Sequence, residues 1–377
     1  MSEHTRLKAA REARDWTQSK VARLIDQRAA ALGMPSRSIA SRQSELSRWE
    51  NGRVTPDPET RRIFRELYGK TNAELGFPDE PLPDAAADEL SERLAIARQV
   101  DAETIEMFRH QVNAVRHADR RFGSAVRLEQ LRSQIGEIEQ LLHHTLLPPQ
   151  RAPLASVLTE ASTLAGWDSL DSGTLHDAWR HYERAKAAAR ESGSTALLAH
   201  ATAEQAFVLV DAGNVADALG LFSEARTIGE QAPRLLRAWL AAAEGEGRAI
   251  AGERTAALHA FDQAHAVLPN ELVHPELPFL FLAGTHLDRW RGNALTCLGD
   301  REAIDHLEAL LDRMPGSFVR ARAATLVDLT LAHAAAGNRT AAETYAKQAH
   351  KIITQVGSIR LRRRLERLTL PGHSLTA

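Results

Sequence analysis

The chain has 377 residues, a formal net charge of −2 and 44% hydrophobic residues, while aromatic residues make up only 5%. This length predicts two or three domains with enough apolar residues for buried cores. The single cysteine, Cys297, excludes a disulfide framework or a cysteine-based metal site within the chain. No segment has the apolar length of a membrane span, and Met1–Arg6 leads into a charged helix rather than a signal peptide. We therefore expect a cytoplasmic protein with no membrane partner.

The apolar set is dominated by Ala and Leu, and no stretch alternates with the period of two that a strand needs. Both features predict an all-α fold. Charge is divided unevenly: residues 1–78 carry 15 Lys and Arg against 10 Asp and Glu, whereas residues 79–377 carry 32 against 39. A basic N-terminal part on an acidic body indicates a polyanionic partner for the N-terminal part alone.

Helix signals divide the first 78 residues. Predicted helices cover residues 5–14, 17–32, 41–52 and 57–68, with a short helix after Thr71. Thr17 is an N-cap candidate, Asp57-Pro58-Glu59 gives a cap, an N1 proline and a first-turn acid, and Thr71 with Glu74 forms a capping box. Gly76, Pro78, Pro81 and Pro83 then mark a domain boundary across residues 76–87.

Residues 79–150 are predicted to form a helical linker, and residues 151–377 a repeat domain. Within residues 154–357 an alanine is followed four residues later by a residue that is usually bulky, and three further on by a small or apolar one. The instances are Ala178/Tyr182/Ala185, Ala218/Phe222/Ala225, Ala257/Phe261/Ala264, Ala303/Leu307/Leu310 and Ala342/Ala346/Ala349, preceded by Gly173, Gly213, Gly252, Gly299 and Gly337. Glycine suits the turn between two antiparallel helices, and alanine lets their backbones approach closely.

This pattern resembles tetratricopeptide repeats, although the spacing of 39 to 46 residues between leading alanines exceeds the family's usual length of about 34. The resemblance implies an α-solenoid with a concave groove for an effector. Aligning the units on their glycines places His200, Phe207, Asp211, Trp239 and Glu246 on that groove. For Trp239 a core position is the alternative. Arg362-Arg363-Arg364 is interpreted as a solvated helix end, with a phosphate contact as the less favoured alternative.

The segment from Thr17-Gln18-Ser19-Lys20-Val21-Ala22 to Ser47-Arg48-Trp49-Glu50-Asn51-Gly52 resembles the helix-turn-helix of phage-repressor-like (XRE-type) regulators, in particular actinobacterial ones with C-terminal repeats. Trp49 matches the buried anchor near the end of the recognition helix. The resemblance implies that Arg42, Gln43, Ser44 and Arg48 face the bases, and that Gln18, Asn51 and Arg53 contact phosphates. Arg48 as a surface salt-bridge former is the alternative.

The match departs from the family in one respect. About fourteen extra residues separate Ile25 from Ser41, and we expect a longer second helix and a connection through Gly33-Met34-Pro35-Ser36. Asp119-Arg120-Arg121-Phe122-Gly123 also resembles a segment that joins the two domains in such regulators. A charged helix cap is an equally good interpretation of that segment.

No catalytic site, metal site or cofactor is predicted. His143, His144, His176 and His181 lack a zinc-binding spacing, and no phosphate-binding loop or nucleophile elbow is present. The sequence therefore favours a non-enzymatic, sequence-specific transcription regulator. We expect it to bind a double-stranded DNA operator as a homodimer and to sense a peptide, small-molecule or protein effector in the repeat groove. The alternative is a repeat scaffold whose helix-turn-helix only tethers a protein complex to DNA.

Overall fold

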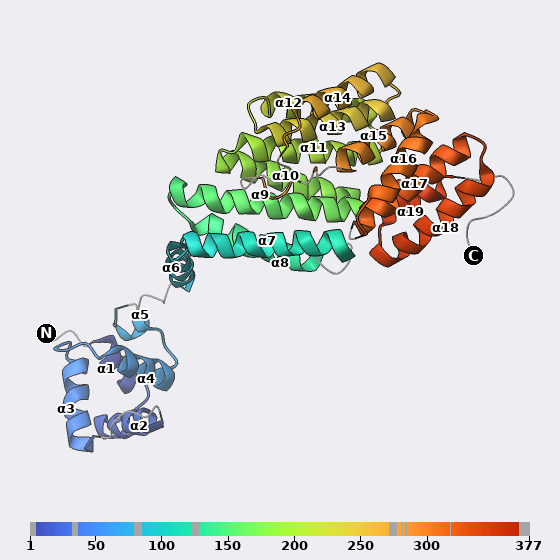
Figure 1. The fold of residues 1–377 in the computed structure, drawn as a ribbon. Coiled ribbons are helices and arrows are strands. Elements are labelled where there is room, and N and C mark those ends of the chain that lie inside the picture. The colour runs from blue at the N-terminus through green and yellow to red at the C-terminus, as the bar shows by residue number, and fades with distance from the viewer. Residues whose placement is uncertain are drawn as a thin grey trace. The chain divides into compact units, whose positions relative to one another are not determined.

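The computed structural model describes residues 5–31, 37–78, 85–122, 128–270, 277–280, 282, 285–316 and 318–368. The chain divides into two compact units, Met1–Leu90 and Ser91–Ala377. Every regular element in the described ranges is a helix, which confirms the all-α prediction (Figure 1). In those ranges no helix combines the length and the apolar composition required to cross a membrane.

The first unit contains five short helices at its N-terminal end. They are α1 (Arg6–Glu12), α2 (Gln18–Ala31), α3 (Ile39–Glu50), α4 (Pro58–Tyr68) and α5 (Asn72–Leu75). The predicted caps are present, because Asp57 accepts from the backbone of Thr60 and Thr71 forms the capping box with Glu74. Helix α3 begins two residues before the prediction, since the Ser38 side chain caps it by accepting from the backbone N–H of Ser41. The predicted Gly33–Ser36 connection lies outside the described residues.

A compact apolar core holds these helices together. Val21, Ile25, Leu46 and Phe64 are fully buried, and Trp49 is 9% exposed. The rings of Trp49 and Phe64 meet edge to face with centroids 5.6 Å apart, a favoured aromatic geometry. The burial predicted for Trp49 is therefore confirmed.

The second unit begins with helices from residues 79–150, the segment predicted to form a linker. Helix α6 (Ala85–Arg98) crosses the boundary between the units, and α7 (Ala102–Phe122) and α8 (Leu128–His144) follow. Phe108 and Val112 of α7 share one core with Ile135 of α8 and Leu158 of the next helix. The apolar faces of α7 and α8 are thus buried against the first repeat, which explains why these two helices belong to the second unit.

The repeat prediction is confirmed by five antiparallel helix pairs in the described part of this unit (Figure 1). The pairs are α9 (Pro148–Asp171) with α10 (Leu175–Ser192), α11 (Thr195–Asp211) with α12 (Val215–Ile228), α13 (Arg234–Ile250) with α14 (Arg254–Val267), α15 (Thr285–Cys297) with α16 (Glu302–Arg313), and α17 (Val319–Ala335) with α18 (Arg339–Val356). A final helix, α19 (Ile359–Glu366), follows.

The turn glycines and the small residues have separate roles in this packing. Gly173, Gly213, Gly252, Gly299 and Gly337 all have φ between 68° and 85°, a region that favours glycine. Within the pairs, a Cβ on Gly245 would lie 2.9 Å from the Phe261 ring, and one on Gly292 would lie 2.3 Å from Leu307. In these two pairs the bulky residue of the outer helix therefore occupies space that a glycine of the inner helix leaves open.

We expect Gly245→Ala to destabilise the second unit by about 1 to 2 kcal/mol, because overpacking against Phe261 outweighs the gain in helix propensity. Gly220→Ala is the matched control, since Gly220 lies within α12 and its added Cβ would meet nothing within 4 Å. That change should stabilise the unit by about 0.5 to 1 kcal/mol. Urea unfolding of both variants measures the two signs, and equal signs would contradict the packing argument.

Candidate functional site

Helix α3 presents polar side chains on one face and its apolar anchors on the other. Ser44 and Arg48 lie one turn apart and are exposed, and Gln43 beside them is half-buried. Leu46 and Trp49 face the core. The structure thus leaves three of the four predicted base-reading side chains accessible to a partner.

The prediction that Arg42, the fourth of these residues, reads bases is wrong. Its side chain is 4% exposed, donates from Nη1 to Glu45 at 3.2 Å and lies 3.7 Å from Asp26 of α2. The reason is helical spacing, because residues 42, 46, 49 and 50 form the buried stripe of α3. Arg42 therefore fastens α3 to α2 and is not available to read bases.

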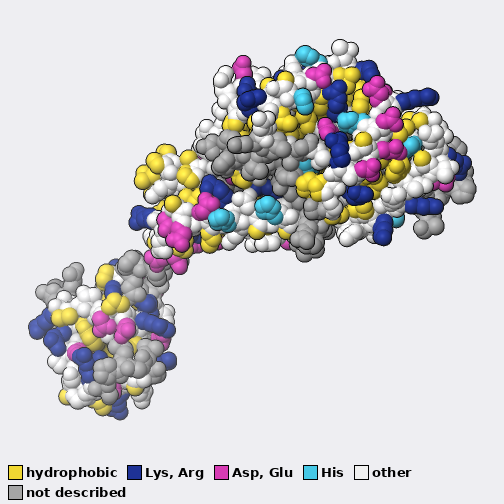
Figure 2. Space-filling model, in the orientation of Figure 1, with side chains coloured by type: hydrophobic (Ala, Val, Ile, Leu, Met, Phe, Trp, Pro, Cys, Tyr) yellow, Lys and Arg dark blue, Asp and Glu magenta, His cyan; other side chains and the backbone are white. Residues whose placement is uncertain are grey.

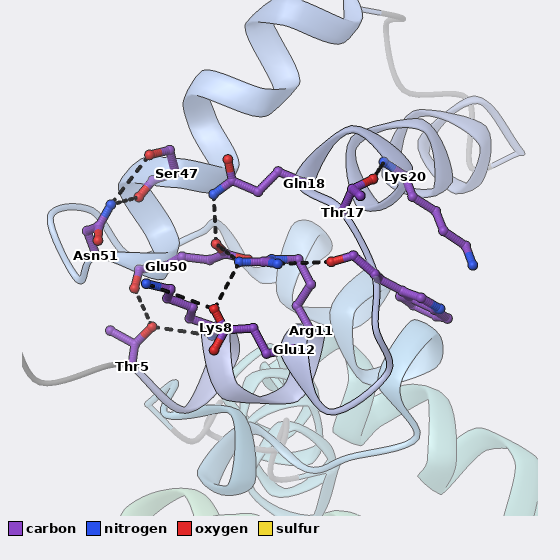
Figure 3. Close-up of polar contacts among 11 residues, drawn as sticks. Thr5, Lys8, Arg11, Glu12, Thr17, Gln18, Lys20, Ser47, Glu50 and Asn51 are labelled. Carbon is purple, nitrogen blue, oxygen red and sulfur yellow. Dashed lines mark hydrogen bonds and ion pairs between the residues drawn. The ribbon is translucent and has the colours of Figure 1, made fainter.

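Glu50, at the end of α3, is the centre of a hydrogen-bond network that joins three helices (Figure 3). Its carboxylate accepts from Arg11 Nε of α1 at 2.6 Å and from Gln18 Nε2 of α2 at 2.8 Å. The backbone carbonyl of Glu50 also accepts from the Thr5 hydroxyl at 2.5 Å. The hydrogen bond with Glu50 raises the pKa of Arg11, so this guanidinium stays charged. This network fixes α3 relative to α1 and α2.

The predicted phosphate contacts lie around that network. Gln18 is half-buried and uses one amide N–H for Glu50, whereas a primary amide has two. Asn51 and Arg53 are exposed after the end of α3, and Asn51 donates to the Ser47 carbonyl at 2.6 Å. Lys and Arg side chains also lie at several places on the visible face of this unit (Figure 2).

A cavity of about 620 Å³ lies inside the second unit and is a second candidate site. Most of its wall comes from the inner helices, α7, α9, α11, α13, α15, α17 and α19. Leu175 at the start of α10 and residues outside the helices, among them Gly173, Phe279 and Phe318, complete it. The five groove residues chosen from the sequence, His200, Phe207, Asp211, Trp239 and Glu246, all line it. Their roles as ligand contacts stay predictions.

The repeat spacing places two residues of every helix pair in the cavity wall. The residues six positions before each turn glycine are Trp167, Phe207, Glu246, Asn293 and Leu331, and all of them line the cavity. Those thirteen positions before are Glu160, His200, Trp239, His286 and Ala324, and they line it too. Extending the glycine alignment to every repeat would have found Trp167 and Asn293, which were missed.

Helix α19 closes this cavity by joining the last repeat to the first ones. Arg360 donates to Asp211 of α11 at 2.7 and 2.9 Å, and the Ser358 hydroxyl donates to Asp171 of α9 at 2.6 Å. Arg364 donates to Asp328 of α17 at 2.6 Å. The interpretation of residues 362–364 as a solvated helix end is therefore wrong for Arg364, although Arg362 and Arg363 are exposed.

A second closure connects α17 to α7. Arg320 donates to both carboxylate oxygens of Asp119 at 2.6 and 2.9 Å, and it lies 3.5 Å from Asp171. Asp119 belongs to the segment that resembled an interdomain joint, and here it forms this ion pair from within α7. The side chains of Arg120–Phe122 and all of Gly123 lie outside the described residues.

Burial sets the protonation of the ionisable groups in the cavity. It lowers the pKa of His200 to about 3, so that the imidazole is neutral and its 3.6 Å contact with Glu204 is not an ion pair. Burial also raises the pKa of Glu204 to about 7, although a hydrogen bond from Tyr182 opposes this shift.

Aromatic rings form one side of the cavity. His200 packs against Trp239 and Phe279 with ring centroids 4.7 and 4.5 Å apart. Trp290 meets Trp239 at 5.6 Å and Phe207 at 6.3 Å. In the described ranges no three His, Cys, Asp or Glu side chains are grouped so that they could hold a metal ion. The cavity is therefore suited to organic ligands with flat apolar surfaces.

Neither a protein-family model nor a curated protein matches this chain. Among solved structures, the chain is similar to a Rap protein complexed with competence and sporulation factor, at 13% identity over 92% of this chain and 97% of that one, with a TM-score of 0.48. Aspartyl phosphate phosphatase F from Bacillus subtilis is 14% identical over 85% and 83%, with a TM-score of 0.47. PlcR from Bacillus thuringiensis, solved with the peptide PapR7 and DNA, is 13% identical over 90% and 96%, with a TM-score of 0.37. At these values, the function of this chain has to be argued from its own residues.

Proposed function

We propose that the chain is a sequence-specific DNA-binding transcription regulator whose repeat unit binds an effector. The observation that carries the proposal is the exposed face of α3, where Gln43, Ser44 and Arg48 stand opposite the buried Trp49 anchor. A helix of this kind enters the major groove of DNA, where Arg can pair with guanine and Gln with adenine. The basic balance of residues 1–78 supports the same partner.

Contacts to the DNA backbone complete the proposed interface. Asn51 and Arg53 extend from the end of α3, and Gln18 stands at the start of α2 with its amide held by Glu50. Such contacts fix the register of a protein on DNA without reading bases. A homodimer would place two α3 helices about one DNA turn apart, roughly 34 Å.

The effector part of the proposal rests on the cavity. Its volume of about 620 Å³ lies within the range of small-molecule sites, and its wall combines aromatic rings with charged groups. A ligand that binds one arrangement of the second unit better than another would shift the population of DNA-competent dimers.

Selection of bound fragments from sheared genomic DNA tests the regulator directly. We expect one recurrent motif with two half-sites spaced by about 10 base pairs, and binding that weakens steeply as salt increases. Weak retention of all fragments alike would instead support the scaffold alternative.

Arg48→Ala should relax base preference at one position of the recovered motif, with a loss of about 1 to 3 kcal/mol on the preferred sequence. Arg53→Ala is the matched control, because its proposed phosphate contact should weaken every sequence to a similar degree and reduce the salt dependence. Quantitative mobility shifts on the motif and on single-base variants measure both effects. Identical behaviour of the two variants would refute the division into base-reading and phosphate-binding residues.

A further inference from the structure

Most charged side chains in the cavity wall are neutralised by a partner. Arg116 donates to Glu160 at 3.2 Å, and the Arg320 and Arg360 pairs were described above. Burying an arginine is costly unless a carboxylate meets it with good geometry. The paired arginines are therefore explained by the closure of the second unit.

Arg289 of α15 differs from these arginines. It lines the cavity, and among the residues that the structure describes no side chain or carbonyl forms a hydrogen bond or ion pair with it. Its Nε is buried without a hydrogen-bond partner, and burial lowers its pKa. Because a guanidinium stays protonated in proteins, this group remains a positive charge without a direct counter-ion.

The carboxyl group of Glu246 does not neutralise Arg289 as the other carboxylates neutralise their arginines, because it forms no direct ion pair with it. Glu246 of α13 also lines the cavity and forms no hydrogen bond or ion pair within the described ranges. Burial raises the pKa of Glu246, although Arg289 opposes the shift. A carboxyl group can relieve its burial by taking up a proton, whereas arginine cannot. When Glu246 carries a proton, Arg289 is therefore the charged member of the two. Asp328, which also stabilises the charge of Arg289, already pairs with Arg364.

The aromatic wall adjoins Arg289. The guanidinium carbon of Arg289 lies 6.0 Å from the ring centroid of Trp290, the next residue, and Trp290 packs against Trp239. Flat apolar surface and a cation without a hydrogen-bonded counter-ion thus occur side by side in one cavity. Such a combination recognises molecules with a ring at one end and an acid at the other.

We propose that the cavity binds a small organic acid with an aromatic ring, whose carboxylate pairs with Arg289 while the ring packs on Trp239 and Trp290. The carboxylate accepts N–H bonds from the guanidinium, which lines the cavity. This inference deepens the proposed effector site. It is tested without DNA, so that it and the DNA-binding proposal can each fail alone.

Calorimetry on the full chain with three probes of one shape tests the inference. The probes are 1-naphthaleneacetate, its neutral amide and the cation 1-naphthylmethylamine. We expect the acid to bind at least about tenfold more tightly than the amide, and the amine to bind most weakly. Quenching of tryptophan fluorescence by the acid gives a second readout, because Trp239 and Trp290 form the proposed contact.

Arg289→Gln should abolish the preference for the acid and leave the amide's affinity within about twofold, since the loss falls on the charged pair alone. Arg291→Gln is the matched control, because Arg291 lies on the same helix, pairs with Asp262 at 2.8 Å and does not line the cavity. It should keep the full preference. A thermal midpoint for Arg289→Gln at or above the wild-type value would show that the variant is folded. If the variant does not fold, the comparison of the three probes on the wild-type chain still tests the inference.

Three results would overturn the inference. The amide or the amine could bind as tightly as the acid, and an amine preference would make Glu246 the recognising group. Arg289→Gln could keep the preference for the acid. Finally, none of the three probes could bind at millimolar concentration. The cavity would then not be a site for aromatic acids, because an aromatic wall beside a free guanidinium should bind the acid at that concentration.

Discussion

Glu50→Ala is expected to cost the first unit about 3 kcal/mol of folding free energy, which is a large share of the stability of a domain this small. The Glu50 side chain is 1% exposed and holds Arg11 and Gln18 through the network in Figure 3. Its removal leaves the mostly buried guanidinium of Arg11 with the Trp16 carbonyl as its remaining hydrogen-bond acceptor. A charge on a side chain that is only 12% exposed is costly without its close carboxylate, and the half-exposed Glu12 at 3.6 Å replaces only part of that interaction.

Glu12→Ala is the matched control, since Glu12 lies 3.6 Å from the same Arg11 but is half exposed. Exposed ion pairs contribute little, and that change should cost less than about 1 kcal/mol. Hydrogen exchange read by mass spectrometry separates the units: peptides within residues 1–90 of Glu50→Ala should exchange faster, and those within residues 91–377 should not. Equal protection in both variants would show that the network does not hold α3.

The affinity for DNA should also depend on the Glu50 network, because that network holds α3 in place. In Glu50→Ala the α3 face keeps its exposed side chains, but α3 loses the side-chain hydrogen bonds from Arg11 and Gln18. The bond from Thr5 remains, because its acceptor is the backbone carbonyl of residue 50. Glu50→Gln keeps an acceptor and a similar shape, so we expect an affinity between those of wild type and Glu50→Ala. This graded loss distinguishes an effect on the orientation of α3 from the removal of a base contact.

Local signals in the sequence were sufficient for the helices and the repeats. Asp57 and Thr71 cap the helices that they were expected to cap, because a cap depends on residues within one turn. The turn glycines and the buried leading alanines were found because every pair repeats the same packing geometry. The groove positions followed from the same alignment, since all inner helices face the cavity in one register.

Contacts between distant parts of the chain could not be predicted in this way. The pairs of Asp119 with Arg320 and of Asp211 with Arg360 join residues that are 201 and 149 positions apart, and neither arginine belongs to the repeat pattern. Arg42 was misplaced for a related reason. The start of α3 lay next to the inserted connection, and only the helix register shows that residue 42 shares the buried face with Leu46.

Arg320→Ala is expected to destabilise the second unit by about 3 to 5 kcal/mol at pH 8.5. The arginine lies beside three buried carboxyl groups, because it pairs with Asp119, lies 3.5 Å from Asp171 and is close enough to Asp168 to influence its pKa. Burial, with the charge of Asp119, raises the pKa of Asp168 to about 9, and burial also raises that of Asp119. Asp168 and Asp119 can hydrogen-bond to each other only while one of them carries a proton.

The sign of the pH dependence follows from these shifts. A carboxyl group whose pKa is raised in the folded state contributes stability below its unfolded pKa of about 4, and this contribution is lost as the pH rises towards the folded value. Arg320 lowers the pKa values of Asp119 and Asp168, so its removal moves both further upward. The difference in stability between wild type and Arg320→Ala should therefore be small near pH 5 and largest near pH 8.5.

Urea unfolding at these two pH values, with hydrogen exchange of α9 and α17 as the local probe, measures the difference. Adding Asp168→Asn to Arg320→Ala should recover part of the loss at pH 8.5, because one of the three crowded carboxyl groups can then no longer ionise. Arg254→Ala is the surface control: it removes an exposed partner of Asp300 and should cost less than about 1 kcal/mol, with no increase towards alkaline pH.

A loss for Arg320→Ala that is greater at pH 5 than at pH 8.5 would mean that Arg320 is held by its aliphatic packing and its position over Trp167 rather than by charge. In that case the closure between α7 and α17 would have to be explained without its carboxylates.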